Sequence, residues 1–184
     1  MAYPRLPAAL VACTDTGVAS KTMTSRLEDI AAAATPACSV ASCSGDLLPP
    51  PLLRAVLDLT TRNLKEIGVT PAELRAKRGE LSHAETQIVA VRSGANLLGF
   101  AAYRLTVEEG VSVAYLYELH VEAYARGMRL GSELVHEVER RGREGGARGL
   151  MLTVHTRNEA ARRWYKGKLH FEVSPISPAC CAPP

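Results

Sequence analysis

The sequence predicts one α/β (α+β) domain over residues 47–175, with a flanking segment at each end. Segments of helical periodicity alternate with segments of strand character in the order α-α-β-β-β-α-β-α-β, which is typical of a sheet covered by helices. The chain of 184 residues is 47% hydrophobic and 22% charged, a balance that allows a packed core and excludes wholesale disorder. This length fits a single domain of ordinary size.

The first predicted elements are two helices. Apolar residues recur at helical spacing over residues 52–67, directly after Pro49–Pro51, which predicts an amphipathic helix. Thr70 is followed by Pro71 and, three residues after the threonine, by Glu73. This order matches an N-cap with a capping box, so a second, short helix is expected to begin there.

Three strands are predicted next. The apolar segments 87–91 and 97–105 flank a Ser-Gly-Ala-Asn turn and predict a β-hairpin. Residues 111–121 predict a longer strand. If its side chains alternate regularly, one face carries Tyr115, Tyr117, Leu119 and Val121, and the other carries Leu116, Glu118 and His120.

The second half of the domain alternates between helix and strand. Helical spacing over residues 130–145 is broken by two glycines, and an apolar strand follows over 150–154. Asn158 is expected to cap a helix that carries Trp164, and residues 169–173 form the last predicted strand.

The flanking segments carry the cysteines. Residues 1–46 are rich in Ala, Ser and Thr, and we expect a disordered tail there; residues 176–184 are expected to be a Pro- and Cys-containing tail. An odd total of five cysteines does not indicate a disulfide framework. Zinc binding by Cys38, Cys43 and Cys180–Cys181 is the alternative to free thiols. No histidine lies at ligand spacing beside them, so no metal is expected.

Charge and hydropathy exclude further classes of protein. The net charge of +3 is too small to indicate nucleic-acid binding by itself. No apolar run reaches the ~18 residues that a membrane-spanning helix needs, and the N-terminus lacks a secretory signal pattern. We therefore expect no nucleic-acid or membrane partner, and a cytoplasmic and nuclear location. The basic residues Arg140, Arg141, Arg143 and Arg148 are interpreted as a solvated helix end, with a phosphate or nucleic-acid contact as the alternative.

The junction after the long strand is the strongest candidate for chemistry. The strand ends at Val121 and the next helix begins near Arg129, with Arg126, Gly127 and Gly131 in or beside the loop. A helix start presents unpaired N–H groups and the positive end of the helix dipole, which suits a phosphate. A tight strand-to-helix turn without a ligand is the alternative.

The order of these elements resembles the GNAT acyl-CoA N-acetyltransferase family over about residues 85–175. Arg126 and Gly131 match the ends of the family's loop pattern Q/R-x-x-G-x-G/A, and Asn158-x-x-Ala161-x-x-Trp164-Tyr165 with Leu169-x-Phe171 follows in order. The resemblance implies a GNAT fold, with a mixed, mostly antiparallel central sheet flanked by helices. It also implies that the last strand is missing, since the sequence stops at Pro184.

A closer resemblance is to the N-terminal acetyltransferase D enzymes. It is carried by Tyr115–Glu122, Leu152–Val154, Leu169–Glu172 and Ser174–Pro178 with the following cysteine pair. The family acetylates the N-terminal serine of histone tails that begin Ser-Gly-Arg-Gly. The resemblance therefore implies an N-α-acetyltransferase that uses acetyl-CoA as co-substrate, acts on protein N-termini and needs no obligate partner subunit.

The transfer needs a base to take a proton from the acceptor amine. Glu118, a carboxylate in mid-strand among apolar and aromatic residues, is the candidate general base, and the resemblance places the family's base there. A structural, ion-paired glutamate is the alternative. Tyr115 and Tyr117 are candidate substrate-binding residues, with core packing as the alternative. The resemblance adds Thr153 and also Thr106, at a position where the D-type enzymes carry an aspartate that grips the basic tail.

The resemblance also assigns the acetyl-CoA contacts. It places the acetyl group beside the backbone of His120, Val121 and Glu122. It places the pyrophosphate on the loop, at Arg126, Met128, Arg129, Leu130, Gly131, Ser132 and Glu133. Asn158 would meet the cofactor from the next helix, or serve as an N-cap instead. Tyr165 lies where many GNAT enzymes keep a tyrosine that protonates the leaving thiolate, although D-type enzymes usually have phenylalanine.

Departures from the family pattern keep two other functions open. Arg129 occupies a family glycine position, where a side chain could block the pyrophosphate or add a charge contact to it. Thr106 lacks the charge that would hold a basic tail, which leaves acidic residues such as Glu108, Glu118 and Glu122 to bind it. The alternatives are an acetyltransferase for lysine or a small amine, and a non-catalytic domain that binds CoA or peptide.

Overall fold

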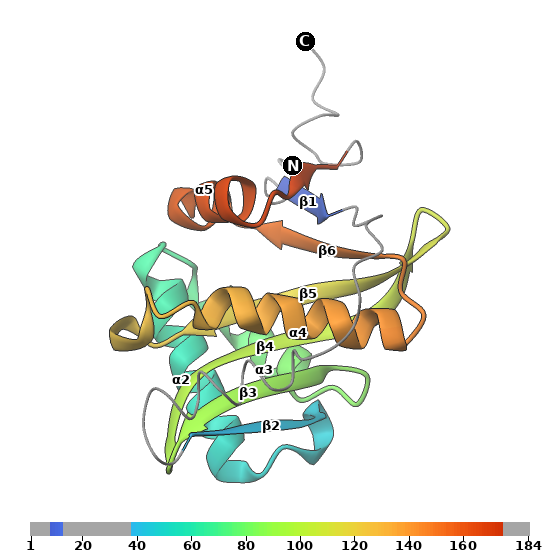
Figure 1. Ribbon diagram of the computed structural model, residues 1–184. Coiled ribbons are helices and arrows are strands. Elements are labelled where there is room, and N and C mark those ends of the chain that lie inside the picture. Colours follow the sequence, from blue (N-terminus) through green and yellow to red (C-terminus); the bar gives the residue numbers. More distant parts are fainter. Residues whose placement is uncertain (1–7, 13–37, 175–184) are drawn as a thin grey trace.

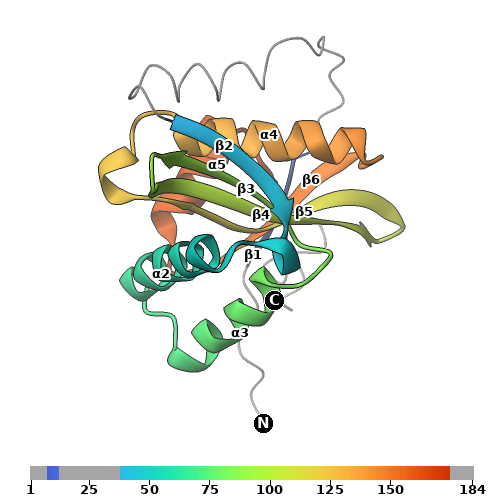
Figure 2. The same cartoon turned by 90° about the horizontal axis from the view of Figure 1, so that it is seen from below.

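The computed structural model describes residues 8–12 and 38–174 and shows a single sheet with helices on both faces (Figures 1 and 2). The strand order is β2-β3-β4-β5-β6-β1-β7. The strands are β1 (Ala8–Ala12), β2 (Cys38–Ser44), β3 (Gln87–Ser93), β4 (Asn96–Glu108), β5 (Val111–Val121), β6 (Gly149–Val154) and β7 (Glu172–Val173). The α-helices are α2 (Pro50–Glu66), α3 (Pro71–Leu81), α4 (Leu130–Glu144) and α5 (Glu159–Lys168).

The sheet is mixed. Its pairs are antiparallel except for β5 and β6, which are parallel. Helix α4 is the crossover connection between these two strands. Helices α2 and α3 lie on one face of the sheet and α4 on the other (Figure 2). The predicted α/β fold, with a mostly antiparallel sheet flanked by helices, is therefore confirmed.

Two strands lie where the sequence predicts a tail. Strand β2 pairs with β3 at one edge of the sheet, and β1 pairs antiparallel with both β6 and β7. The expectation of a tail over residues 1–46 is therefore wrong for these two segments, and residues 1–7 and 13–37 lie outside the described residues. The expected C-terminal tail, residues 176–184, also lies outside them. Strand β1 comes from the N-terminal part of the chain and lies between β6 and β7. The sequence analysis predicts no strand in that part of the chain.

The ends of helix α3 follow from its sequence. Thr70 accepts a hydrogen bond from the N–H of Glu73, and the Glu73 carboxylate accepts one from the N–H of Thr70 at 2.7 Å. This is the predicted capping box, and Pro71 occupies the first helical position, where its missing N–H costs nothing. The helix continues to Leu81, whose buried side chain belongs to the hydrophobic cluster formed by α2 and the sheet.

The two faces of the sheet bury separate hydrophobic clusters. The α4-side cluster is built around Leu116, Leu134, Val138, Leu150 and Leu152. The α2-side cluster is built around Val56, Leu59, Leu81, Ile88 and Phe100. Both are largely aliphatic, as the low aromatic content requires. None of the helices in the described part of the chain has the length and hydropathy that a membrane crossing requires.

Candidate active site

Strand β5 contains a bulge beside the candidate base. Leu116 pairs with Tyr103 and Glu118 pairs with the adjacent Ala102, so Tyr117 is an extra residue in the ladder. An extra residue shifts the alternation of side chains by one position. Residues before and after Tyr117 therefore do not follow one regular alternation along β5.

This phase shift corrects the predicted faces of β5. Leu116 and Leu119 both pack on the α4 side, although a regular strand would separate them. On the opposite face the Tyr115 and Tyr117 rings lie 4.9 Å apart, and the His120 ring lies 5.4 Å from Phe100. The residues that face α2 and α3 are Tyr115, Tyr117, Glu118 and His120. The prediction that the tyrosines and Glu118 lie on different faces is wrong, and the bulge is what brings them together.

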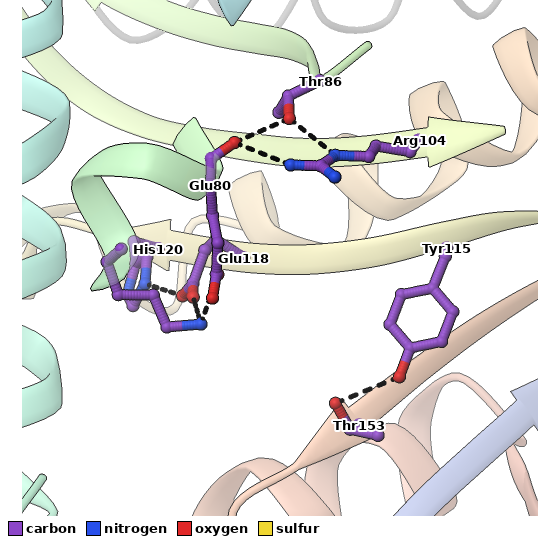
Figure 3. A network of polar contacts seen from close by, with 8 residues as sticks. Glu80, Thr86, Arg104, Tyr115, Glu118, His120 and Thr153 are labelled. Carbon is purple, nitrogen blue, oxygen red and sulfur yellow. Dashed lines mark hydrogen bonds and ion pairs between the residues drawn. The ribbon is translucent and has the colours of Figure 1, made fainter. Parts of the chain in front are cut away.

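Glu118 is a buried carboxylate with two partners. Its side chain is 6% exposed, and Oε2 lies 2.6 Å from Nε2 of His120 (Figure 3). Oε1 lies 2.8 Å from Nζ of Lys77. Burial alone would raise the pKa of Glu118, but the hydrogen bond from His120 and the charge of Lys77 outweigh it, so the pKa lies below its ordinary value. Glu118 is therefore ionised at neutral pH.

Asn63 of α2 connects His120 to the loop after β5. Its Nδ2 lies 3.3 Å from Nδ1 of His120 and 3.4 Å from the carbonyl oxygen of Val121, and its Oδ1 accepts a hydrogen bond of 3.0 Å from Arg126. Because Nδ2 can only donate, Nδ1 of His120 must accept. The proton of a neutral His120 then lies on Nε2, where it is donated to Glu118.

The two tyrosines are held from neighbouring strands. The hydroxyl of Tyr115 donates to Oγ1 of Thr153 on β6 at 3.3 Å (Figure 3). The guanidinium of Arg104 on β4 lies 4.8 Å from the ring centroid of Tyr117. The structure thus brings three of the expected substrate-binding residues, Tyr115, Tyr117 and Thr153, to the side of the sheet that holds Glu118. The fourth, Thr106, pairs with Val113 in the β4–β5 hairpin, four residues beyond the partner of Glu118.

The site lies where β5 and β6 part. Their parallel pairing ends at Leu116 and Leu152, and the strands spread apart toward the start of α4 (Figure 1). Among the described residues no strand pairs with the β6-facing backbone of residues 117–121. A strand edge without a partner can bind the amide-rich arm of acetyl-CoA. At the end of this edge the Val121 carbonyl oxygen already lies 3.4 Å from Nδ2 of Asn63, and the N–H of Glu122 donates to the carbonyl oxygen of Leu98.

The loop from Arg126 to the first turn of α4 fits a pyrophosphate. Leu130, Gly131 and Ser132 supply N–H groups that a helix cannot pair internally, and Met128 is exposed. Glu133 is the exception among the expected contacts. Its side chain is buried and its N–H already donates to the carbonyl oxygen of Arg129, at 3.1 Å.

Arg129 adopts a left-handed backbone conformation of the kind that favours glycine. It is the N-cap of α4, with φ of 64° and ψ of −1° in the left-handed region. A non-glycine residue pays roughly 1–2 kcal/mol for this conformation, so the turn is kept at some cost in strain. The Arg129 side chain is exposed, and it therefore remains available to a phosphate group.

Two residues at the start and within α5, Asn158 and Tyr165, are expected to contact the cofactor or the leaving thiolate. The Asn158 side chain accepts a hydrogen bond from the N–H of Ala161 at 3.1 Å, which is its N-cap role. Tyr165 is buried between Trp164 and Phe171, at ring distances of 4.8 and 5.4 Å. Burial, assisted by the charge of Glu118, raises the pKa of Tyr165 well above its ordinary value.

Acidic and basic residues around the site are largely engaged with one another. Glu122 forms an ion pair with Arg62 of α2, and Glu118 holds Lys77, so two of the carboxylates expected to attract a basic tail already have a cation. The arginines at the end of α4 are paired too. Their partners are Glu137 and Glu144 for Arg140, Glu137 for Arg141 and Glu139 for Arg143.

Sequence reasoning missed Lys77, Asn63 and Arg104. Lys77 belongs to a short, charged helix, and no pattern in the sequence distinguishes it from its neighbours Arg75 and Arg78. The side-chain contact between Glu118 and His120 was open to prediction, because residues two apart on a strand share a face.

Comparison with known proteins identifies the class of protein. Residues 53–171 match the model of the acetyltransferase (GNAT) family. The chain therefore belongs to the GNAT acetyltransferases, and its co-substrate is acetyl-CoA.

Solved structures share the fold at low sequence identity. One is an aminoglycoside acetyltransferase from an uncultured soil metagenomic sample, in complex with trehalose (12% identity, TM-score 0.56, 71% of this chain and 86% of that one). Another is a ribosomal-protein-alanine N-acetyltransferase from Brucella melitensis (16% identity, TM-score 0.56, 72% of this chain and 90% of that one). A third is an aminoglycoside N-acetyltransferase in complex with CoA (15% identity, TM-score 0.52, 71% of this chain and 85% of that one).

Proposed function

We propose that this GNAT protein acetylates the N-terminal α-amine of a protein or peptide, with Glu118 as the group that binds and deprotonates the amine. The observation that supports this most is a buried carboxylate beside two tyrosines at the point where β5 and β6 part. An α-amine has an ordinary pKa of ~7.7–8.0 against ~10.4 for lysine. A carboxylate therefore deprotonates an α-amine at a smaller free-energy cost.

The proposed reaction is a direct transfer in a ternary complex. Glu118 takes a proton from the acceptor ammonium, directly or through a water molecule. The amine nitrogen then forms a bond to the acetyl carbon while the bond from that carbon to the CoA sulfur breaks, and the nitrogen loses its second proton to solvent. Tyr165, whose phenol is protonated at neutral pH, is the proposed donor of a proton to the departing thiolate, and it regains a proton from solvent.

The finer proposal is a histone-type N-terminus, Ser-Gly-Arg-Gly. It rests on the resemblance of Tyr115–Glu122 and Leu152–Val154 to the D-type enzymes. In this proposal Tyr115, which is joined to Thr153 by a hydrogen bond, contacts the first residues of such a peptide. The proposed acidic contacts to the tail are Glu108 and Glu109, since Glu118 and Glu122 already hold cations.

A small amine is the second candidate substrate. The guanidinium of Arg104 lies over Tyr117, and Thr106 supplies no negative charge on the same strand. Both features disfavour a strongly basic peptide near the tyrosines and favour an amine that carries few positive charges. Aminoglycoside acetyltransferases are among the proteins that share the fold, but aminoglycosides are polycations, to which the same charge argument applies.

The test is a regiochemical assay by mass spectrometry. The full chain is incubated with acetyl-CoA and a Ser-Gly-Arg-Gly-Lys peptide, a copy with a blocked N-terminus, or an aminoglycoside. Acetylation of the α-amine of the free peptide alone supports the proposal. Product on the lysine side chain or on the aminoglycoside alone contradicts it. CoA binding by calorimetry without any product favours the non-catalytic alternative.

A further inference from the structure

The candidate base is already occupied by an ammonium group of the chain itself. Nζ of Lys77 lies 2.8 Å from Oε1 of Glu118 and 2.7 Å from Oε2 of Glu80. Its partners differ in accessibility, since the side chain of Glu118 is 6% exposed and that of Glu80 is 35% exposed. Lys77 therefore bridges one carboxylate inside the site and one near the surface.

An acceptor amine has one oxygen of Glu118 at which to bind. Oε2 is held by His120 at 2.6 Å, and His120 is fixed in turn by Asn63 and by its place in strand β5. Oε1 is the remaining oxygen, and it is the one that Lys77 holds. Two ammonium groups at one carboxylate oxygen repel each other, so the acceptor and Lys77 cannot both bind there favourably.

We propose that Lys77 is a built-in competitor for the acceptor amine, which holds Oε1 of Glu118 until the acceptor displaces it onto Glu80. The proposal rests on the role of Glu118 in the proposed function and adds a residue that sets the affinity for the acceptor. The competitor has the chemistry of the acceptor itself, a primary ammonium group.

The surroundings of Lys77 suit a side-chain movement without a movement of α3. Glu80 lies one turn further along the same helix, so Lys77 keeps a partner when it leaves Glu118. The carbonyl oxygen of Glu80 accepts hydrogen bonds from Arg104 at 3.1 Å and from Thr86 at 2.7 Å (Figure 3). These bonds fasten the end of α3 to the sheet, so the helix can stay in place while the side chain moves.

The exchange of one ammonium group for another leaves the charge at Oε1 of Glu118 unchanged. The charge of Lys77 is one of the causes that hold the pKa of Glu118 below its ordinary value, while the contacts with Glu118 and Glu80 raise the pKa of Lys77 to about 12, against the lowering effect of its burial. When the acceptor ammonium takes the place of Lys77 at Oε1, it becomes the group whose proton Glu118 can accept. The raised pKa of Lys77 also makes it a poor acetyl acceptor, because the neutral amine is scarce.

The test is steady-state kinetics of peptide acetylation at saturating acetyl-CoA. Lys77→Met removes the competitor, and we expect KM for the peptide to fall several-fold. Glu80→Gln removes the alternative partner, and we expect KM to rise several-fold. In the double variant the effect of Glu80→Gln should vanish, because Lys77 is no longer there to be held. Arg75→Met removes an exposed cation from the same helix and should leave KM unchanged.

The two variants are expected to change KM for the peptide in opposite directions, so the inference can be tested even if one of them folds poorly. A higher KM in a folded Lys77→Met variant would show that Lys77 merely supports Glu118, and would overturn the inference. If Lys77→Met does not fold, Glu80→Gln alone decides, and an unchanged KM overturns it. Acetyl-Lys77 in the wild-type protein after incubation with acetyl-CoA would also overturn it, since Lys77 would then be an acceptor. Absence of any product from wild type contradicts the proposed function, whereas normal turnover with unaltered KM contradicts this inference alone.

Discussion

Asn63 fixes the imidazole of His120 from the neighbouring helix, with 3.3 Å between Nδ2 and Nδ1. The same amide accepts a hydrogen bond from Arg126, at the start of the loop that we propose binds the pyrophosphate. A line of polar contacts therefore runs from this loop through Asn63 and His120 to Glu118.

Asn63→Asp tests this line of contacts. Aspartate can still accept from Arg126 but cannot donate to Nδ1 of His120, so the histidine loses the constraint that directs its Nε2 proton to Glu118. One hydrogen bond is worth roughly 0.5–1.5 kcal/mol, so we expect kcat to fall by about 2–13-fold. The affinity for CoA, measured by calorimetry, should change little. Equal kcat in both proteins would show that the orientation of His120 is irrelevant to turnover.

Arg129→Gly and Arg129→Asn separate backbone strain from side-chain charge at the start of α4. Glycine relieves the left-handed conformation, and we expect the free energy of unfolding to rise by up to about 1 kcal/mol. Both variants remove the guanidinium, and both should bind CoA several-fold more weakly if it contacts a phosphate. Tighter CoA binding by the glycine variant would mean that the arginine obstructs the loop.

Acid unfolding tests the ionisation of Glu118. Its pKa is lowered in the folded protein from an ordinary value of 4.5, so its ionisation stabilises the fold above that pH, and this contribution is lost as the pH falls through the folded pKa. Glu118→Gln lacks the contribution at every pH. We expect the difference in unfolding free energy between wild type and variant to shrink as the pH is lowered from 7 through 4.5 and below. A difference that stays constant over this range would contradict the lowered pKa.

Leu10→Pro tests the N-terminal strand. Leu10 pairs with Leu152 of β6 on one side and with Val173 of β7 on the other, so β1 has partners on both edges. Proline removes a ladder donor, and inside a paired strand we expect a loss of about 2–3 kcal/mol in unfolding free energy. Chemical denaturation measures it, with Ala8→Pro at the first residue of the strand as the milder control. Equal stability of Leu10→Pro and wild type would show that β1 adds nothing to the fold.

Most of the domain could be predicted from local sequence patterns. The bounds of β5 and the capping box of α3 follow from periodicity and capping chemistry, which depend on residues close in the chain. Strands β1 and β2 could not be predicted, because Ala- and Ser-rich segments have weak strand propensity and form strands by pairing with distant edges.

The sequence names residues of the candidate site but does not predict how they are arranged. Glu118 and the two tyrosines were found as residues, yet their common face depends on a bulge at Tyr117 that arises from pairing with β4. Lys77 lies 41 residues before Glu118, and only the packing of α3 on the sheet brings the two together. Such contacts are set by tertiary structure and leave no local pattern.

The central claim is that Glu118 accepts the proton of the acceptor amine. Single-turnover acetylation of the Ser-Gly-Arg-Gly-Lys peptide by wild type and Glu118→Gln tests it most directly, with CoA affinity measured on the same samples. General-base catalysis contributes ~10²–10⁴-fold, so we expect the rate of the variant to fall by at least about 100-fold while CoA binding is unchanged. A folded Glu118→Gln protein that acetylates the α-amine at the wild-type rate would contradict the claim.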